Sequence, residues 1–123
     1  MQWLAVAFGG ALGSLARYAI NIALLPVFGD RFPASTLLVN LGGSILVGCC
    51  YALIVERGLL PAELRNLLMV GFLGAFTTFS AFSLDTIALW QNGQAIFAIL
   101  YIFLTVTLCL LGTLSAIFLI RLF

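Results

Sequence analysis

The chain has 123 residues, of which 64% are hydrophobic and 7% charged, and its formal net charge is +1. So few charged side chains cannot cover the surface of a water-soluble domain of this length, so the composition predicts an integral membrane protein. The small net charge, without a clustered basic run, excludes nucleic acid as a partner that defines the function. The absence of histidine and of paired acidic residues makes the chain a poor candidate for an enzyme.

Four apolar segments are each long enough to cross about 30 Å of hydrocarbon as a helix. They cover residues 3–25, 34–55, 64–91 and 94–121. Because they account for nearly the whole chain, we predict an all-α integral membrane protein whose residues 1–123 form a single four-helix transmembrane domain. Prolines mark the first two connections, and Asn92-Gly93 predicts a tight turn in the third. The lipid bilayer is therefore an expected partner.

The arginines give a small orientation signal. Arg57, Arg65 and Arg121 belong to the side that carries the N-terminus, whereas Arg31 lies on the opposite side with Asp30 in the first connection. The positive-inside rule then favours an internal N-terminus. A bias this small is compatible with chains that insert in both orientations.

The first span combines small residues with one intramembrane cation. Gly9 and Gly13 have the spacing that lets a neighbouring backbone approach closely. Arg17 either extends its guanidinium to the interface or forms an electropositive vestibule that gathers anions. Asp85 of the third span points to the same side of the membrane, so we hypothesise an Arg17–Asp85 pair within one chain or across two.

The second span carries a polar stripe. Asn40 lies in mid-membrane, with Thr36 one turn before it and Ser44 one turn after it. An asparagine at this depth either joins helices by hydrogen bonding or donates its amide hydrogens to a passing anion. Both interpretations fit these residues.

One stretch of the third span is poorly suited to an unbroken helix among lipid tails, namely Gly71-Phe-Leu-Gly-Ala-Phe-Thr-Thr-Phe-Ser-Ala-Phe-Ser83. We predict that the helix is interrupted near Gly74 to Thr78, which is tolerated only where the freed backbone is buried or lines a polar cavity. Freed carbonyls would face a cation and freed amides an anion. Phe76, Phe79 and Phe82 should share one side of the helix, either as core or lipid-facing residues or with their electropositive ring edges along an anion path.

The fourth span repeats polar residues at four-residue intervals: Tyr101, Thr105, Cys109 and Thr113. Hydroxyls on a membrane helix commonly bond their own backbone carbonyls. Hydroxyls stacked along one face are also what an anion needs when it leaves water. The pattern is compatible with either role.

These features resemble the small bacterial fluoride channels of the Fluc or CrcB family over the full length of the chain. The resemblance is carried by Gly13-x-x-x-Arg17-Tyr18, by Val39-Asn40 and, most specifically, by the motif from Gly71 to Ser83. It implies an antiparallel, dual-topology homodimer in the bacterial inner membrane. Such a dimer exports fluoride passively from the cytoplasm and thereby lowers its toxicity.

The resemblance also implies roles for individual residues. Asn40, Phe79 and Phe82 match pore positions, and Ser80, Thr105 and Thr113 supply hydroxyls, although Cys109 replaces the serine usual in the polar track. A structural sodium ion at the dimer centre would be held by backbone carbonyls at Gly74 and Thr77.

Two other classes remain as alternatives. A small dual-topology multidrug or cation exporter needs a membrane-embedded carboxylate in its first span, where this chain offers Arg17. A non-transport assembly subunit fits the small-residue faces but leaves the interrupted third span unexplained.

Overall fold

The computed structural model describes residues 1–28 and 32–123, so Asp30 and Arg31 lie outside the described residues. All of the regular structure in this part of the chain is helical. The elements are α1 (Gln2–Phe28), α2 (Ala34–Cys50), η1 (Tyr51–Glu56), η2 (Arg65–Leu73), α3 (Gly74–Phe76), α4 (Phe79–Gln91) and α5 (Ala95–Leu122), where η denotes π-helical turns.

These elements form membrane-length rods. Among residues 1–28 and 32–123, four stretches are long and apolar enough to cross a membrane, namely Gln2–Phe28, Ala34–Glu56, Arg65–Gln91 and Ala95–Leu122. The predicted spans are therefore confirmed within a few residues. The largest difference is at the first span, where α1 continues through Pro26 to Phe28. Pro26 lacks the N–H that would donate to the carbonyl of Ile22, so the last turn of α1 has one backbone hydrogen bond fewer.

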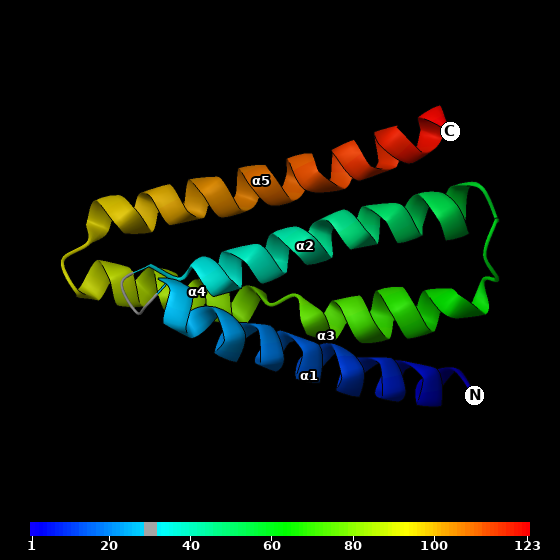
Figure 1. Ribbon diagram of the computed structural model, residues 1–123, viewed down its shortest axis with the longest axis horizontal. Coiled ribbons are helices and arrows are strands. Elements are labelled where there is room, and N and C mark those ends of the chain that lie inside the picture. Colours follow the sequence, from blue (N-terminus) through cyan, green and yellow to red (C-terminus); the bar gives the residue numbers. More distant parts are fainter. Residues whose placement is uncertain (29–31) are drawn as a thin grey trace.

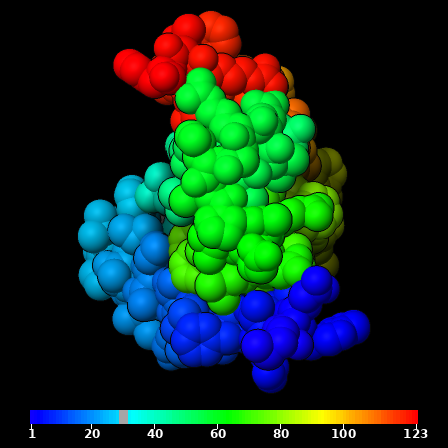
Figure 2. Space-filling view, turned by 90° about the vertical axis from the view of Figure 1, so that its right-hand side faces the viewer, coloured from blue at the N-terminus to red at the C-terminus, as the bar shows by residue number. Residues whose placement is uncertain are grey.

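The rods run alternately up and down (Figure 1). Both termini and the connection over residues 57–64 lie at one end (Figures 1 and 2). The connection between α4 and α5 lies at the other end (Figure 1). Gly93 adopts φ 76° there, and the N–H of Gln94 donates to the carbonyl of Leu89, which confirms the predicted tight turn. Helix α1 packs mainly on η2 and α3, while α2 packs on α5.

Glycines set the close contact between α1 and the third span. A Cβ atom at Gly9 would overlap the carbonyl oxygen of Leu67, and one at Gly13 would overlap that of Phe72. Gly71 approaches α1 from the other side, where a Cβ would meet the carbonyl of Val6 at 2.8 Å. This confirms that the small residues of the first span serve close backbone approach.

The π-helical turns were not predicted from the sequence. The N–H of Gly74 reaches back to the carbonyls of both Gly71 and Met69, and the N–H of Arg57 donates to the carbonyl of Ala52, five residues earlier. Such wide turns rotate the side chains that follow them and often accompany functional sites. In the third span they lie directly before the predicted interruption.

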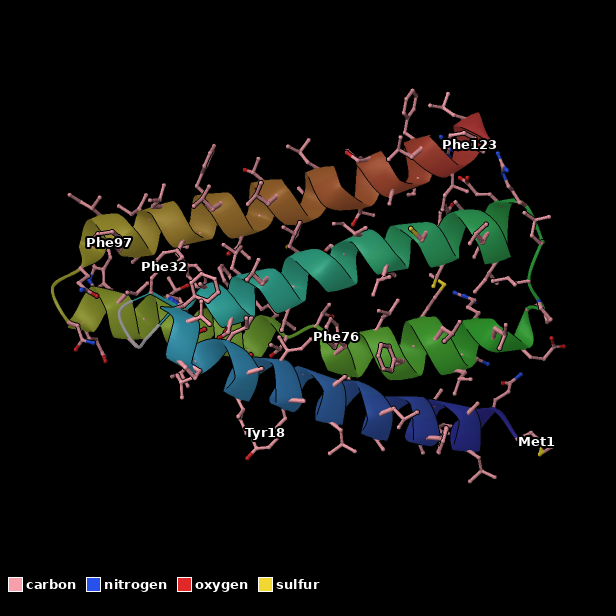
Figure 3. All side chains as sticks on the ribbon, in the orientation of Figure 1. Met1, Tyr18, Phe32, Phe76, Phe97 and Phe123 are labelled. Carbon is pink, nitrogen blue, oxygen red and sulfur yellow. The ribbon has the colours of Figure 1, made fainter. Side chains whose placement is uncertain are left out.

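Little of the apolar surface is covered within one chain. Only 17% of the most apolar window of α5 is buried, and Tyr18 points away from the neighbouring helices on the outer side of α1 (Figure 3). Two small clusters form the interior, one around Phe82, Leu89, Ala98 and Tyr101 and the other around Val39, Leu73 and Phe76. The remaining apolar surface suits lipid or another protein chain.

Candidate functional site

The third span is interrupted at two consecutive threonines. Helix α3 ends at Phe76, Thr77 has φ −76° and ψ 154°, and Thr78 has φ −149° and ψ 115°. Both residues are extended, so the predicted break is confirmed. The Oγ1 atom of Thr78 accepts a hydrogen bond from the N–H of Ala81 at 3.2 Å and thereby caps α4.

The side chain of Asn40 contacts the backbone at this break. Its Oδ1 atom accepts from the N–H of Thr78 at 2.7 Å, and its Nδ2 atom donates to the carbonyl of Thr78 at 3.0 Å. Both residues are buried. The stripe predicted on the second span therefore faces the break, although its Thr36 end reaches a different cavity.

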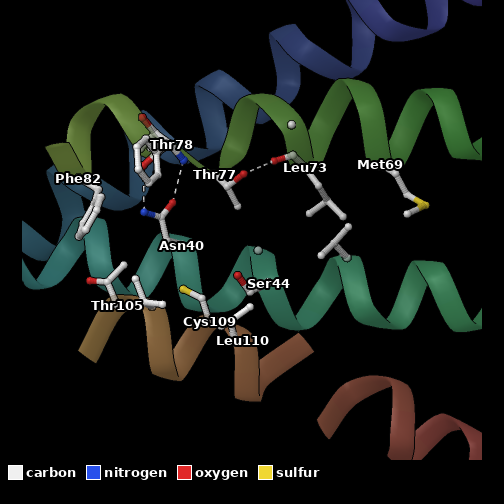
Figure 4. A pocket seen from close by; sticks show the side chains of 15 residues that line it. Asn40, Ser44, Met69, Leu73, Thr77, Thr78, Phe82, Thr105, Cys109 and Leu110 are labelled. Carbon is white, nitrogen blue, oxygen red and sulfur yellow. Dashed lines mark hydrogen bonds between the residues drawn. The ribbon is translucent and has the colours of Figure 1, made fainter. Parts of the chain in front are cut away.

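A cavity of about 430 Å³ opens beside the break (Figure 4). It lies among α2, the two halves of the third span, and α5. Its lining is mostly apolar and comprises Asn40, Gly43, Ser44, Val47, Met69, Leu73, Gly74, Thr77, Thr78, Phe79, Phe82, Thr105, Val106, Cys109 and Leu110. Six of the predicted site residues are thus brought together: Asn40, Gly74, Thr77, Phe79, Phe82 and Thr105.

The two phenylalanines after the break differ in environment. Phe82 is 7% exposed and packs 5.2 Å from the ring of Tyr101, whereas Phe79 is 77% exposed although its ring lies only 5.3 Å from that of Phe82. The expectation that Phe76 shares their side was wrong, because the extended threonines separate it from them. Phe76 instead stacks on Phe72 in the preceding half-helix.

The polar residues of α5 divide into two kinds. Thr105 is 6% exposed, and its hydroxyl has no hydrogen-bond partner among the described residues. The hydroxyl of Thr113 is occupied, because it is within bonding distance of the carbonyls of Ser44 at 2.9 Å and Cys109 at 3.1 Å. Thr105 and Cys109 line the cavity, and Thr113 does not.

Ser80 is also outside the cavity lining. Its hydroxyl lies 3.2 Å from that of Thr78, so it joins the cap of α4. The side chain of Thr77 is likewise occupied, because its hydroxyl donates to the carbonyl of Leu73 at 2.8 Å. The hydroxyl hydrogen of Thr77 is therefore not available to an anion, whereas its oxygen and the backbone carbonyl are acceptors.

A second, more polar cavity of about 270 Å³ lies towards the α4–α5 connection and is lined in part by Thr36, Asp85 and Asn92. Asp85 accepts a hydrogen bond from the hydroxyl of buried Tyr101 at 3.3 Å. Within the described residues of one chain, no ion pair joins Asp85 to Arg17. Arg17 is half-buried on α1 and lines neither of these cavities. A pair across two chains stays a prediction.

Three further residues contribute to this site. Thr78 caps α4 and pairs with Asn40, which the Thr-Thr sequence before a helix could have indicated. Gly43 packs on the break, since a Cβ there would overlap the methyl group of Thr77. Met69 lies within η2 and lines the cavity.

Comparison with known proteins gives a consistent assignment. The profile described as "CrcB-like protein, Camphor Resistance (CrcB)" matches residues 4–117. A fluoride-specific ion channel of Saccharophagus degradans is 50% identical over 115 residues, which is 94% of this chain and 86% of that protein. A fluoride-specific ion channel of Hahella chejuensis is 48% identical over 117 residues, which is 95% of this chain and 92% of that protein. One of Methylococcus capsulatus is 44% identical, and the matched region is 48% of that longer protein. The chain is therefore a multi-pass membrane protein that belongs to the CrcB-like family.

Proposed function

We propose that this protein is a fluoride-specific ion channel that lets fluoride leave the cytoplasm passively across the bacterial inner membrane. Its family and the names of its relatives support this assignment. The observation that carries it is the cavity beside the break, whose mostly apolar lining includes the rings of Phe79 and Phe82 and the hydroxyl of Thr105. This hydroxyl has no hydrogen-bond partner within residues 1–28 and 32–123.

The lining suits a small, strongly hydrated anion. Fluoride can leave water only if donors replace its hydration shell. Thr105 offers a hydroxyl, and the phenylalanine ring edges offer weakly electropositive C–H groups. The start of α4 adds the partial positive charge of a helix N-terminus. None of these groups is a fixed cation, so the anion is bound weakly enough to leave again.

We further propose that the channel is an antiparallel homodimer. Gly74 is exposed in one chain, and a Cβ there would meet no atom closer than 3.6 Å. The carbonyl of Gly74 loses the helical donor Thr78, and an unpaired polar group of this kind is costly in hydrocarbon. A second copy packed over the break would cover both this backbone and the exposed ring of Phe79. The small arginine bias is compatible with insertion in both orientations.

A sodium ion between the two breaks fits the groups present. The N–H of Thr78, which in an unbroken helix would bond the carbonyl of Gly74, donates to Asn40 instead. The carbonyls of Gly74 and Thr77 from each chain are therefore the proposed ligands, and carbonyl oxygens are suited to hard cations. The ion's charge would offset part of the cost of bringing an anion into a low dielectric.

Ion efflux from reconstituted vesicles tests the function. Vesicles loaded with potassium fluoride should release fluoride to an ion-selective electrode once valinomycin balances the charge, and chloride-loaded vesicles should not release chloride. Proton-coupled uptake of a cationic dye would instead indicate the exporter alternative. Protein-containing vesicles that release none of these solutes would favour the non-transport alternative.

A further inference from the structure

Asn40 and the peptide of Thr78 form a pair in which each supplies one donor and one acceptor (Figure 4). The two hydrogen bonds measure 2.7 and 3.0 Å, and Asn40 and Thr78 are 8% and 9% exposed. A side-chain amide has the same groups as a backbone peptide, so Asn40 can replace the partners that a helix would provide. A buried peptide without such partners is costly.

The break begins at the N–H of Thr78, which donates a hydrogen bond to Asn40. The N–H of Thr77 still donates to the carbonyl of Leu73 at 3.0 Å, as in a regular helix. The next N–H, that of Thr78, should bond to the carbonyl of Gly74 if the helix continued. It donates instead to Oδ1 of Asn40. The side chain on α2 therefore competes with the carbonyl of Gly74 for one hydrogen.

Neighbouring residues of α2 fix this arrangement on both sides. Val39 is 2% exposed and packs in one cluster with Leu73 and Phe76, on the half-helix before the break. One turn after Asn40, the absence of a side chain at Gly43 admits the methyl group of Thr77. Asn40 is thus held against the extended backbone at Thr78, and its side chain bonds to a peptide of the break.

We infer that Asn40 is a positioning residue that keeps the third span open and releases the carbonyl of Gly74 for a ligand. Its Oδ1 atom and one Nδ2 hydrogen are committed to Thr78, which leaves at most one hydrogen for an anion. The link to ion binding rests on the proposed function. The replacement of the carbonyl of Gly74 by Asn40, as the acceptor for the N–H of Thr78, does not rest on it and can be measured separately.

Thr77-Thr78 is the only Thr-Thr pair in the sequence. In protein labelled with ¹³C,¹⁵N-threonine and reconstituted in bilayers, a solid-state NMR transfer from amide nitrogen to the preceding carbonyl therefore selects this pair alone. The ¹³Cα and ¹³Cβ shifts of Thr77 report whether its backbone is extended. Hydrogen–deuterium exchange of the selected amide reports whether the N–H of Thr78 is bonded.

Wild-type protein should show extended shifts at Thr77 and slow exchange at Thr78. Asn40→Leu, which removes both partners, should move the Thr77 shifts towards helical values or accelerate exchange at Thr78 by at least about tenfold. Asn40→Asp retains the acceptor, so the slow exchange should persist. Asn66→Leu, the same change at a partly buried asparagine of η2, is the control and should leave the signal unchanged.

The inference is overturned if Asn40→Leu keeps both the extended shifts and the slow exchange. A loss of efflux in that variant would then mean that Asn40 acts on the ion directly. If the variant does not fold, the pair is tested in wild-type protein labelled with ¹³Cγ-asparagine and ¹⁵N-threonine. The Asn40–Thr78 contact should give a strong dipolar coupling between the two labels. Absence of this coupling refutes the pair. Efflux of fluoride by the wild type is measured alongside, so failure of the proposed function is distinguished from failure of this inference.

Discussion

The hydroxyl of Tyr101 donates a hydrogen bond to the carboxylate of Asp85, and the side chain of Tyr101 is completely buried. Its neighbours explain this position: Phe32 meets the ring edge-on at 5.5 Å and Phe82 packs at 5.2 Å. Tyr101 thus contacts residues of both cavities, because Phe82 lines the first and Phe32 and Asp85 line the second. An intramembrane carboxylate needs such a donor, because it is costly when left unpaired.

Tyr101→Phe should therefore retain the packing of the ring while depriving Asp85 of this donor. We expect a loss of about 1–3 kcal/mol in the free energy of unfolding, since a partly buried acceptor is left unsatisfied, and a slower fluoride efflux. Thermal unfolding in detergent and electrode-monitored efflux are the two measurements. Tyr51→Phe removes a hydroxyl from an exposed position and should change neither. Equal behaviour of the two variants would exclude a role for the Tyr101–Asp85 bond.

Phe79→Ile should abolish fluoride efflux and leave the protein folded. The ring of Phe79 is 77% exposed in one chain, so its replacement removes little packing from that chain, whereas the electropositive ring edge is lost. Efflux and gel filtration together report the two effects. Phe97→Ile, at a 51% exposed ring on α5, is the matched control and should conduct normally. Unchanged efflux in Phe79→Ile would refute a pore role for this ring.

Thr105→Val should reduce transport without loss of stability. The hydroxyl of Thr105 is buried and has no partner among the described residues, so an isosteric apolar side chain should leave the melting temperature unchanged or raise it. Efflux should fall several-fold, because a donor is removed from the cavity. Thr107→Val, off the cavity lining, serves as the control. A Thr105→Val protein that melts lower and conducts normally would contradict both parts.

Gly13→Ala should destabilise the protein, whereas Gly10→Ala should not. A Cβ at Gly13 would overlap the carbonyl of Phe72, but one at Gly10 would lie 4.0 Å from the nearest atom, the carbonyl oxygen of Gly71. Forcing α1 away from η2 should cost about 1–3 kcal/mol. Thermal unfolding of both variants checks the difference. Similar melting temperatures would mean that α1 and η2 separate readily.

Removal of sodium tests the proposed cation. If carbonyls of two chains share a sodium ion, exchange of sodium for N-methylglucamine should lower the melting temperature of the dimer and favour single chains, because ligand binding stabilises the folded assembly. Thermal unfolding and multi-angle light scattering in matched buffers measure the two effects. Potassium-containing buffer controls for ionic strength. Identical melting in all three buffers would argue against a structural sodium ion.

The sequence by itself determined the membrane rods, the tight turn at Gly93 and the position of the interruption. These depend on local properties: hydropathy sets the length of a span, a glycine with positive φ ends a helix, and consecutive threonines between glycine and phenylalanine weaken the helical ladder. Family resemblance also indicated Asn40, Phe79, Phe82 and Thr105 as pore residues. The structure places all four around one cavity.

Only the tertiary structure decided which polar groups are occupied and which are available. Thr105 and Thr113 look alike in the sequence, yet the hydroxyl of Thr113 is bonded to the backbone and that of Thr105 has no partner among residues 1–28 and 32–123. Asn40 likewise meets one peptide 38 residues away. Such pairings depend on the rotation and separation of packed helices, which glycine contacts and π-helical turns set across the whole bundle, and a one-dimensional pattern of residues does not contain that geometry.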